Sequence, residues 1–156
     1  MRTSQTLVTG TVLALTLAAG TASAQVAGPS LAEAKKAIAA AQDFATKAGT
    51  RLSCAVIDAR GAIVATERMD GAPFFAADAA RGKALVAASF GSPSGALASL
   101  STSGLGQLLP GPGTPLFMQG AVPVKKAGAN AGAIGCSGGT AQQDEDGAKA
   151  GAATIQ

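Results

Sequence analysis

A helix is predicted over residues 31–48, where apolar residues recur every three or four positions. The recurring residues are Leu31, Ala34, Ile38, Ala41 and Ala45. Ser30 and Glu33 stand just before and inside this segment at the spacing of a capping box. Gly49 follows the last turn, where a glycine commonly ends a helix.

A β-hairpin is predicted next. Residues 52–57 read Leu-Ser-Cys-Ala-Val-Ile, which is typical of a strand largely buried on both faces. Residues 58–61 form a turn with Asp first and Gly fourth, and residues 62–69 return as the second strand.

The remaining pattern alternates helices, loops and strands. Residues 75–90 predict an Ala-rich helix, and Ser94 starts a short helix that runs to Leu100. A Gly/Ser/Pro-rich loop over 101–115 precedes a short strand at 116–118. A second hairpin is expected from 122–126 and 131–137, and a last helix after the capping-box spacing Thr140 to Gln143, reaching about Thr154.

This order of elements predicts an α+β fold, because hairpins give a mainly antiparallel sheet whose faces the helices can cover. It is not a doubly wound fold. No Gly-x-Gly-x-x-Gly follows a strand, and no P-loop is present.

The first 24 residues are predicted to be a signal peptide rather than part of the fold. Arg2 precedes an apolar stretch over 7–19, and Ala22-Ser23-Ala24 supplies a small-x-small cleavage site before Gln25. We therefore expect a single domain over 25–156, located in the periplasm or secreted, without membrane insertion after cleavage.

Composition narrows the chemistry. The formal net charge is +3, and the 12 basic residues are scattered, so no nucleic-acid partner is expected. The chain has no His, which removes the commonest general base, metal ligand and haem ligand. No catalytic residue and no metal site are predicted, and an enzyme is disfavoured.

Several motifs together resemble a known family. They are Ala-Val-Ile-Asp-Ala-Arg-Gly at 55–61, Arg-Met-Asp-Gly-Ala at 68–72, Lys-Ala at 83–84 and Gly-Ala-Ile-Gly-Cys-Ser-Gly-Gly at 132–139. These resemble the GlcG/HbpS-like haem-binding proteins, which are related to the PduO C-terminal domain. The resemblance implies a profilin-like α/β/α fold with a five-stranded sheet, a homo-oligomer, and in some members haem binding or degradation.

The first candidate site follows the second strand. Arg68 could pair with a haem propionate, and Met69 could be an apolar wall or sulfur ligand beside Phe74 and Phe75. In the alternative, Arg68 and Asp70 fix the turn and Met69 belongs to the core.

Further cofactor-binding candidates are Lys83, Thr114 and Met118. Lys83 could reach a ligand carboxylate or have a solvated head, the hydroxyl of Thr114 could be a weak iron ligand, and Met118 could line a cavity or simply pack.

A separate anion-binding candidate is the segment Ser137, Gly138, Gly139 and Thr140, where a strand ends and a helix opens. Its alternative is a tight turn with a helix cap.

The resemblance also bears on the two cysteines. In a profilin-like sheet the first strand lies beside the last, so Cys54 and Cys136 are expected on neighbouring strands. Register decides whether the side chains share a face, and both a disulfide and two buried thiols remain open.

Three functions are compatible with these observations. The first is an exported module that binds or senses haem or a similar anionic cofactor. The second is an oligomeric structural or interaction protein without a ligand. The third is an accessory enzyme of hydroxy-acid metabolism.

Overall fold

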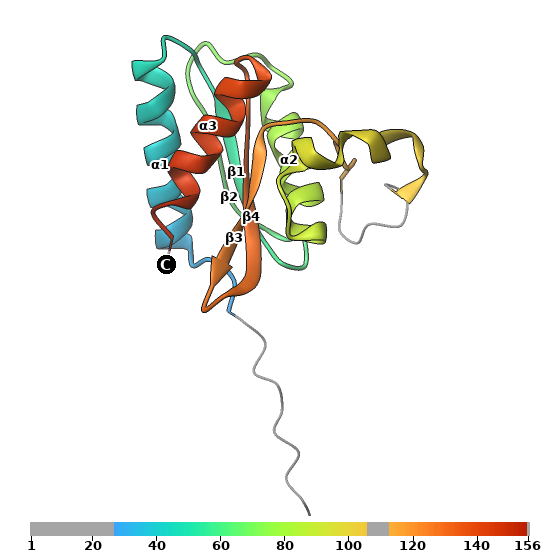
Figure 1. The fold of residues 1–156 in the computed structure, drawn as a ribbon. Coiled ribbons are helices and arrows are strands. Elements are labelled where there is room, and N and C mark those ends of the chain that lie inside the picture. Colours follow the sequence, from blue (N-terminus) through green and yellow to red (C-terminus); the bar gives the residue numbers. More distant parts are fainter. Residues whose placement is uncertain (1–26, 106–112, 156) are drawn as a thin grey trace, which may run out of the picture.

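A central sheet separates two helical layers, α1 with α3 on one side and α2 on the other (Figure 1). The computed structural model describes residues 27–105 and 113–155. The expected signal peptide lies outside these residues. No helix in the described part of the chain is long and apolar enough to cross a membrane.

The elements follow the predicted order closely. They are α1 (Leu31–Lys47), β1 (Ser53–Asp58), β2 (Ile63–Arg68), α2 (Ala76–Phe90), the 3-10 helix η1 (Ser94–Thr102), β3 (Ala121–Lys126), β4 (Ala129–Ser137) and α3 (Ala141–Ala152). The α+β architecture is thus confirmed.

The sheet has four strands in the order β2-β1-β4-β3, and each neighbouring pair is antiparallel. The expectation of five strands was wrong for the described residues. The predicted short strand at 116–118 bonds elsewhere, because Leu116 N–H donates to Gly82 of α2 and Met118 N–H donates to Leu116. This segment therefore runs along α2 instead of extending the sheet.

Both capping boxes form as the spacing indicates. The Ser30 hydroxyl accepts from Glu33 N–H, and the Glu33 carboxylate accepts from Ser30 N–H at the start of α1. Thr140 and Gln143 repeat this exchange at the start of α3. The ends of both helices are thereby fixed by local sequence.

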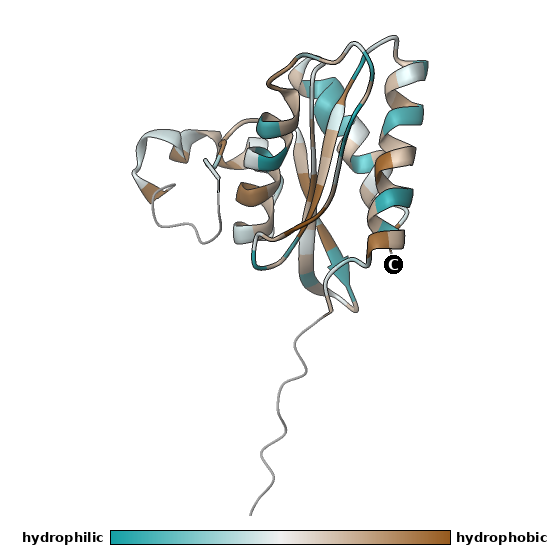
Figure 2. Ribbon diagram, turned by 180° about the vertical axis from the view of Figure 1, so that it is seen from behind, coloured by the Kyte–Doolittle hydropathy of each residue, from teal (hydrophilic) through white to brown (hydrophobic). Residues whose placement is uncertain are grey.

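Small residues allow α2 to lie close to the sheet. A Cβ added at Gly135 would collide with the carbonyl oxygen of Ala80 and lie 2.9 Å from Ala84 N. Ala80 and Ala84 are both fully buried. Hydrophobic positions gather in the central strands between the helical layers (Figure 2).

Cys54 and Cys136 are directly opposed in the β1–β4 register and form a disulfide, with Cα atoms 4.2 Å apart. The predicted adjacency is confirmed, and the alternative of two buried thiols is wrong. The register places both side chains on the face covered by α1 and α3, where they join the larger core cluster.

Candidate functional site

A pocket of about 310 Å³ opens on the α2 side of the sheet. It lies where the start of α2, the segment 116–119 and the turn from β4 into α3 meet. Its lining residues are Pro73, Phe75, Ala79, Lys83, Leu116, Met118, Gln119, Ser137, Gly138, Gly139, Ala141 and Asp144.

A buried ion pair forms part of the pocket lining. Lys83 Nζ of α2 lies 2.7 Å from Asp144 Oδ2 of α3, and each side chain is 4% exposed. The expectation of a solvated Lys83 head was wrong. The Ala-rich surface of α2 leaves room for the lysine chain to turn inward, where the Asp144 carboxylate compensates its charge.

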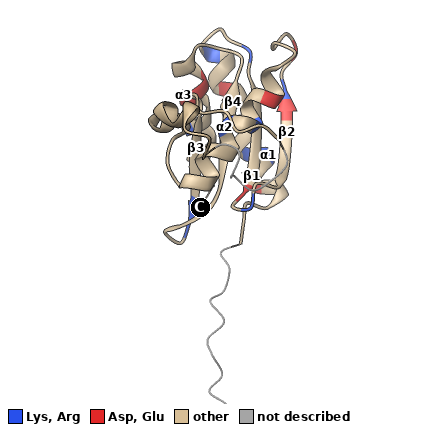
Figure 3. Ribbon diagram, turned by 90° about the vertical axis from the view of Figure 1, so that its right-hand side faces the viewer, with Lys and Arg blue, Asp and Glu red and all other residues tan. Residues whose placement is uncertain are grey.

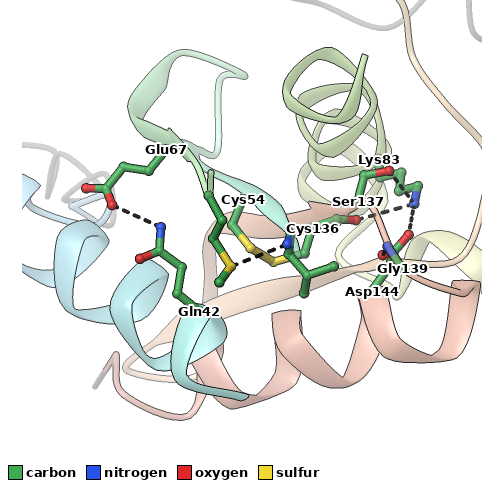
Figure 4. The surroundings of a disulfide bond; sticks show 10 residues. Gln42, Cys54, Glu67, Lys83, Cys136, Ser137, Gly139 and Asp144 are labelled. Atoms are coloured by element: carbon green, nitrogen blue, oxygen red, sulfur yellow. Dashed lines mark hydrogen bonds and ion pairs between the residues drawn. A yellow bond between two sulfur atoms is a disulfide. The ribbon is translucent and has the colours of Figure 1, made fainter. Parts of the chain in front are cut away.

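Groups at the end of β4 and in the turn after it form the other hydrogen bonds of this ion pair. Lys83 Nζ also donates to Cys136 O and to Ser137 Oγ, both at 3.3 Å, and Gly139 N–H donates to Asp144 Oδ1 at 2.9 Å (Figure 4). Gly120 packs against the pair, since a Cβ there would lie 2.8 Å from Lys83 Nζ. Its φ of +135° also favours glycine.

Exposed apolar side chains line the mouth of the pocket. Phe75 is 52% exposed and Met118 is 53% exposed, although both belong to the lining. Phe74 is still more exposed and meets Phe75 edge to face, with ring centroids 5.5 Å apart. Exposed apolar side chains that gather at the rim of a hollow are typical of a binding site.

Ser94 holds the backbone that carries Met118. Its buried hydroxyl donates to Met118 O at 2.6 Å and accepts from Ala121 N–H at 3.0 Å. The 3-10 helix η1 is thereby tied to the pocket wall and to β3.

Six of the predicted site residues meet at this pocket: Phe75, Lys83, Met118, Ser137, Gly138 and Gly139. Thr140 of the proposed anion site is instead the N-cap of α3. Gly139 N–H is engaged by Asp144. The turn-and-cap interpretation therefore accounts for Gly139 and Thr140.

Other predicted residues lie elsewhere. Arg68 Nη1 donates to Ala72 O at 2.9 Å, which fixes the turn after β2. Met69 packs against the core, and its sulfur accepts from Leu52 N–H at 3.4 Å. Thr114 lines a second hollow with Arg81. For Arg68 and Met69, the structural alternative describes the contacts.

Sequence reasoning missed Leu116, Gln119 and Asp144 as pocket residues. One signal was available, because the residues three and four positions from Lys83 are Ala79, Ala80, Val86 and Ala87, and a lysine buried on such an apolar face needs a carboxylate. Nothing in the sequence indicated that the carboxylate would come from α3.

The contact between Ser137 and Lys83 has the residue types of a nucleophile and a base. The Lys83 ammonium, however, donates to the Ser137 hydroxyl and is paired with Asp144. A general base must instead accept the hydroxyl proton. The arrangement therefore favours a binding site over acyl-transfer chemistry.

Charged positions elsewhere are spread over several elements, with acidic and basic segments interspersed in the view of Figure 3. The Lys126 ammonium and the Ser30 N–H hold the pKa of Glu33 at about 2, below its ordinary 4.5. This carboxylate is far along the chain from the pocket lining and serves the α1 cap.

Comparison with known proteins identifies the family. The sequence model described as haem degrading protein HbpS-like matches residues 30–153. A double mutant of HbpS from Streptomyces reticuli is 36% identical, covering 94% of this chain and 99% of that chain, with a TM-score of 0.77. No curated protein sequence matches the chain.

Two further solved structures share the fold. The Klebsiella pneumoniae protein ORFY is 27% identical and covers 85% of this chain and 94% of its own, with a TM-score of 0.74. A complex of PduOC with haem is 25% identical and covers 83% and 96%, with a TM-score of 0.72. The chain therefore belongs to the HbpS-like family of haem-degrading proteins.

Proposed function

We propose that this protein binds haem, or a similar flat anionic cofactor, at the pocket between α2 and the start of α3. The observation that carries the proposal is an apolar hollow whose mouth presents Phe75 and Met118 to solvent. Membership of a haem-associated family and the haem complex of PduOC support the choice of ligand.

Few side chains of this protein could ligate the iron of a bound haem. The chain has no His and no Tyr, and both Cys are consumed in the disulfide. The thioether of Met118 is then the pocket's candidate iron ligand, a known haem-ligand type. Phe75 and Leu116 would contact the ring. Bound haem supplies a redox-active iron and a strong visible chromophore.

Haem titration of the purified protein tests this proposal. We expect a saturable Soret shift with about one haem per chain. Ala79→Leu, which fills the pocket, should weaken binding by about tenfold or more, since a leucine occupies the ligand's space. The same substitution at Ala39, exposed on α1, is the matched control. Equal titrations of the two variants would place the haem elsewhere.

The proposed iron ligand has its own test. Met118→Leu keeps an apolar side chain of similar volume and removes the sulfur. The ferrous haem spectrum should therefore change while the ring still binds. An unchanged spectrum in both oxidation states would exclude Met118 as the ligand.

We also propose that the protein acts outside the cytoplasm, where it would meet haem as a sensor or carrier. The disulfide supports this location, because disulfides persist in oxidising compartments. Mass spectrometry of the exported protein should find Gln25 at the N-terminus. A retained Met1 in a membrane fraction would contradict the cleavage.

Self-association is the second candidate function, and Phe74 is the observation that favours it. This side chain is 89% exposed and lies against the exposed Phe75, and adjacent exposed apolar groups are typical of association surfaces. Light scattering should show a homo-oligomer that Phe74→Ser weakens. A monomer at all concentrations would exclude it.

A further inference from the structure

We infer that the pocket receives the uncharged edge of its ligand and leaves the ligand's carboxylates in solvent. This inference rests on the proposed function and adds the orientation of the ligand. It reverses the expectation that Lys83 reaches a ligand carboxylate.

The hydrogens of Lys83 are already used. An ammonium group has three donors. Those of Lys83 have three acceptors within the protein: Asp144 Oδ2 at 2.7 Å, Cys136 O at 3.3 Å and Ser137 Oγ at 3.3 Å. A ligand carboxylate would have to displace one of these bonds to reach the nitrogen.

Asp144 makes that displacement unfavourable. Its Oδ2 accepts from Lys83, and its Oδ1 accepts from Gly139 N–H. The pair is neutral as a unit. A second carboxylate placed beside it would lose its hydration and face a like charge, and the described residues that line the pocket offer no further cation to offset either cost.

The rest of the lining suits an uncharged edge. Most of the remaining side chains are apolar: Pro73, Phe75, Ala79, Leu116, Met118 and Ala141. The amide of Gln119 donates to Gln142 at 3.2 Å. With about 310 Å³, the pocket is at the small end for a ligand site. It therefore has room for the vinyl and methyl edge of a tetrapyrrole, with the propionates pointing outward.

Three ligands separate the two orientations on the native protein. They are haem, haem with both propionates esterified to methyl esters, and deuterohaem, in which hydrogen replaces each vinyl group, all titrated in one solvent. We expect the diester to bind within about threefold of haem. Deuterohaem should bind about tenfold more weakly, because it buries less apolar surface.

A variant without the buried ion pair of the pocket provides the second measurement. The double variant Lys83→Met with Asp144→Leu removes both charges, so the ratio of haem affinity to diester affinity should stay within about threefold of its native value, whatever happens to the affinity itself. Lys125→Met, which removes one exposed positive charge from β3, is the control for net charge. A double variant that does not fold leaves the three-ligand series on the native protein as the deciding result.

The outcomes distinguish this inference from the function on which it rests. Absence of saturable haem binding overturns the proposed function and the inference together. Saturable haem binding that esterification weakens more than about tenfold, with deuterohaem unaffected, overturns the orientation alone. Equal binding of all three ligands also overturns it, since neither edge would then be inside the pocket.

Discussion

Adjacent residues of the central strands lie on opposite faces of the sheet and make different kinds of contact there. Cys54 and Cys136 point into the layer covered by α1 and α3, where they form a disulfide among aliphatic side chains. Ser137, one residue further along β4, faces α2 and accepts a hydrogen bond from Lys83 (Figure 4). On one face a disulfide joins the two central strands, and on the other face lie a buried ion pair and a pocket.

This difference follows from the alternation of side chains along a strand. A slip of β4 by one residue against β1 would turn Cys136 to the α2 face and Ser137 to the core, while Cys54 stayed where it is. The observed register therefore places the disulfide on one face and the pocket on the other.

The largest effect is expected from the buried ion pair. Asp144→Leu leaves the Lys83 charge buried without its carboxylate, which should reduce the free energy of unfolding by about 3–5 kcal/mol. Urea denaturation at neutral pH measures the loss. The variant should also bind haem more tightly than its dimethyl ester, because the Lys83 ammonium becomes available to a ligand carboxylate.

The double variant Lys83→Met with Asp144→Leu is the control for this prediction. It removes both charges and keeps similar volume, so it should recover most of the lost stability. Equal destabilisation of the single and double variants would mean that packing, and not the unpaired charge, causes the loss.

The disulfide should give the next largest effect. Replacing both Cys54 and Cys136 by Ala releases a cross-link between residues 82 positions apart, which should cost about 2–5 kcal/mol. Haem binding should remain as in the native protein, because the sulfurs lie on the other face. A double Ala variant that unfolds like the native protein would contradict the stability prediction, and one with altered haem affinity would show that the faces are coupled.

The sequence predicted elements whose signals are local. Both capping boxes and both hairpins depend on residues close in the chain, and they form where expected. The adjacency of the cysteines came from the resemblance, and their shared face needed the register. The prediction of a strand at 116–118 was wrong because Leu116 N–H bonds to Gly82 of α2. A short apolar run cannot reveal such a long-range hydrogen bond.

The candidate site was only partly predictable for the same reason. Phe75, Met118 and Ser137 were identified from local motifs, yet neither alternative for Lys83 placed it in a buried ion pair. Its burial depends on Asp144, 61 positions later on another helix. The partners of such an ion pair are far apart in the sequence, so no local spacing of residues predicts it.

Close packing of α2 gives a smaller expected effect. Ala84 is fully buried against the sheet, so Ala84→Leu should overpack this face and cost about 1–3 kcal/mol. Ser89→Leu places the same side chain on the exposed end of α2 and should change stability by less than about 0.5 kcal/mol. Similar denaturation midpoints for both variants would contradict tight packing at Ala84.

The smallest effect concerns a partly exposed ion pair, the counterpart of the buried one. Lys126 Nζ lies 2.8 Å from Glu33 Oε1, and with the Ser30 N–H it holds the pKa of Glu33 at about 2, lowered from 4.5. The unfolded chain therefore takes up this proton first as pH falls. The stabilisation is complete above pH 4.5 and is lost progressively toward pH 2.

Glu33→Gln should flatten the dependence of unfolding free energy on pH between about 4.5 and 2, because glutamine keeps the capping box but does not titrate. Lys126→Met should flatten it in part, since the Ser30 N–H still bonds to the carboxylate. Urea denaturation at a series of pH values measures the slopes. Slopes that match the native protein in both variants would mean that the acid sensitivity of this fold comes from other carboxylates, and that the exposed pair contributes only to the geometry of the α1 cap.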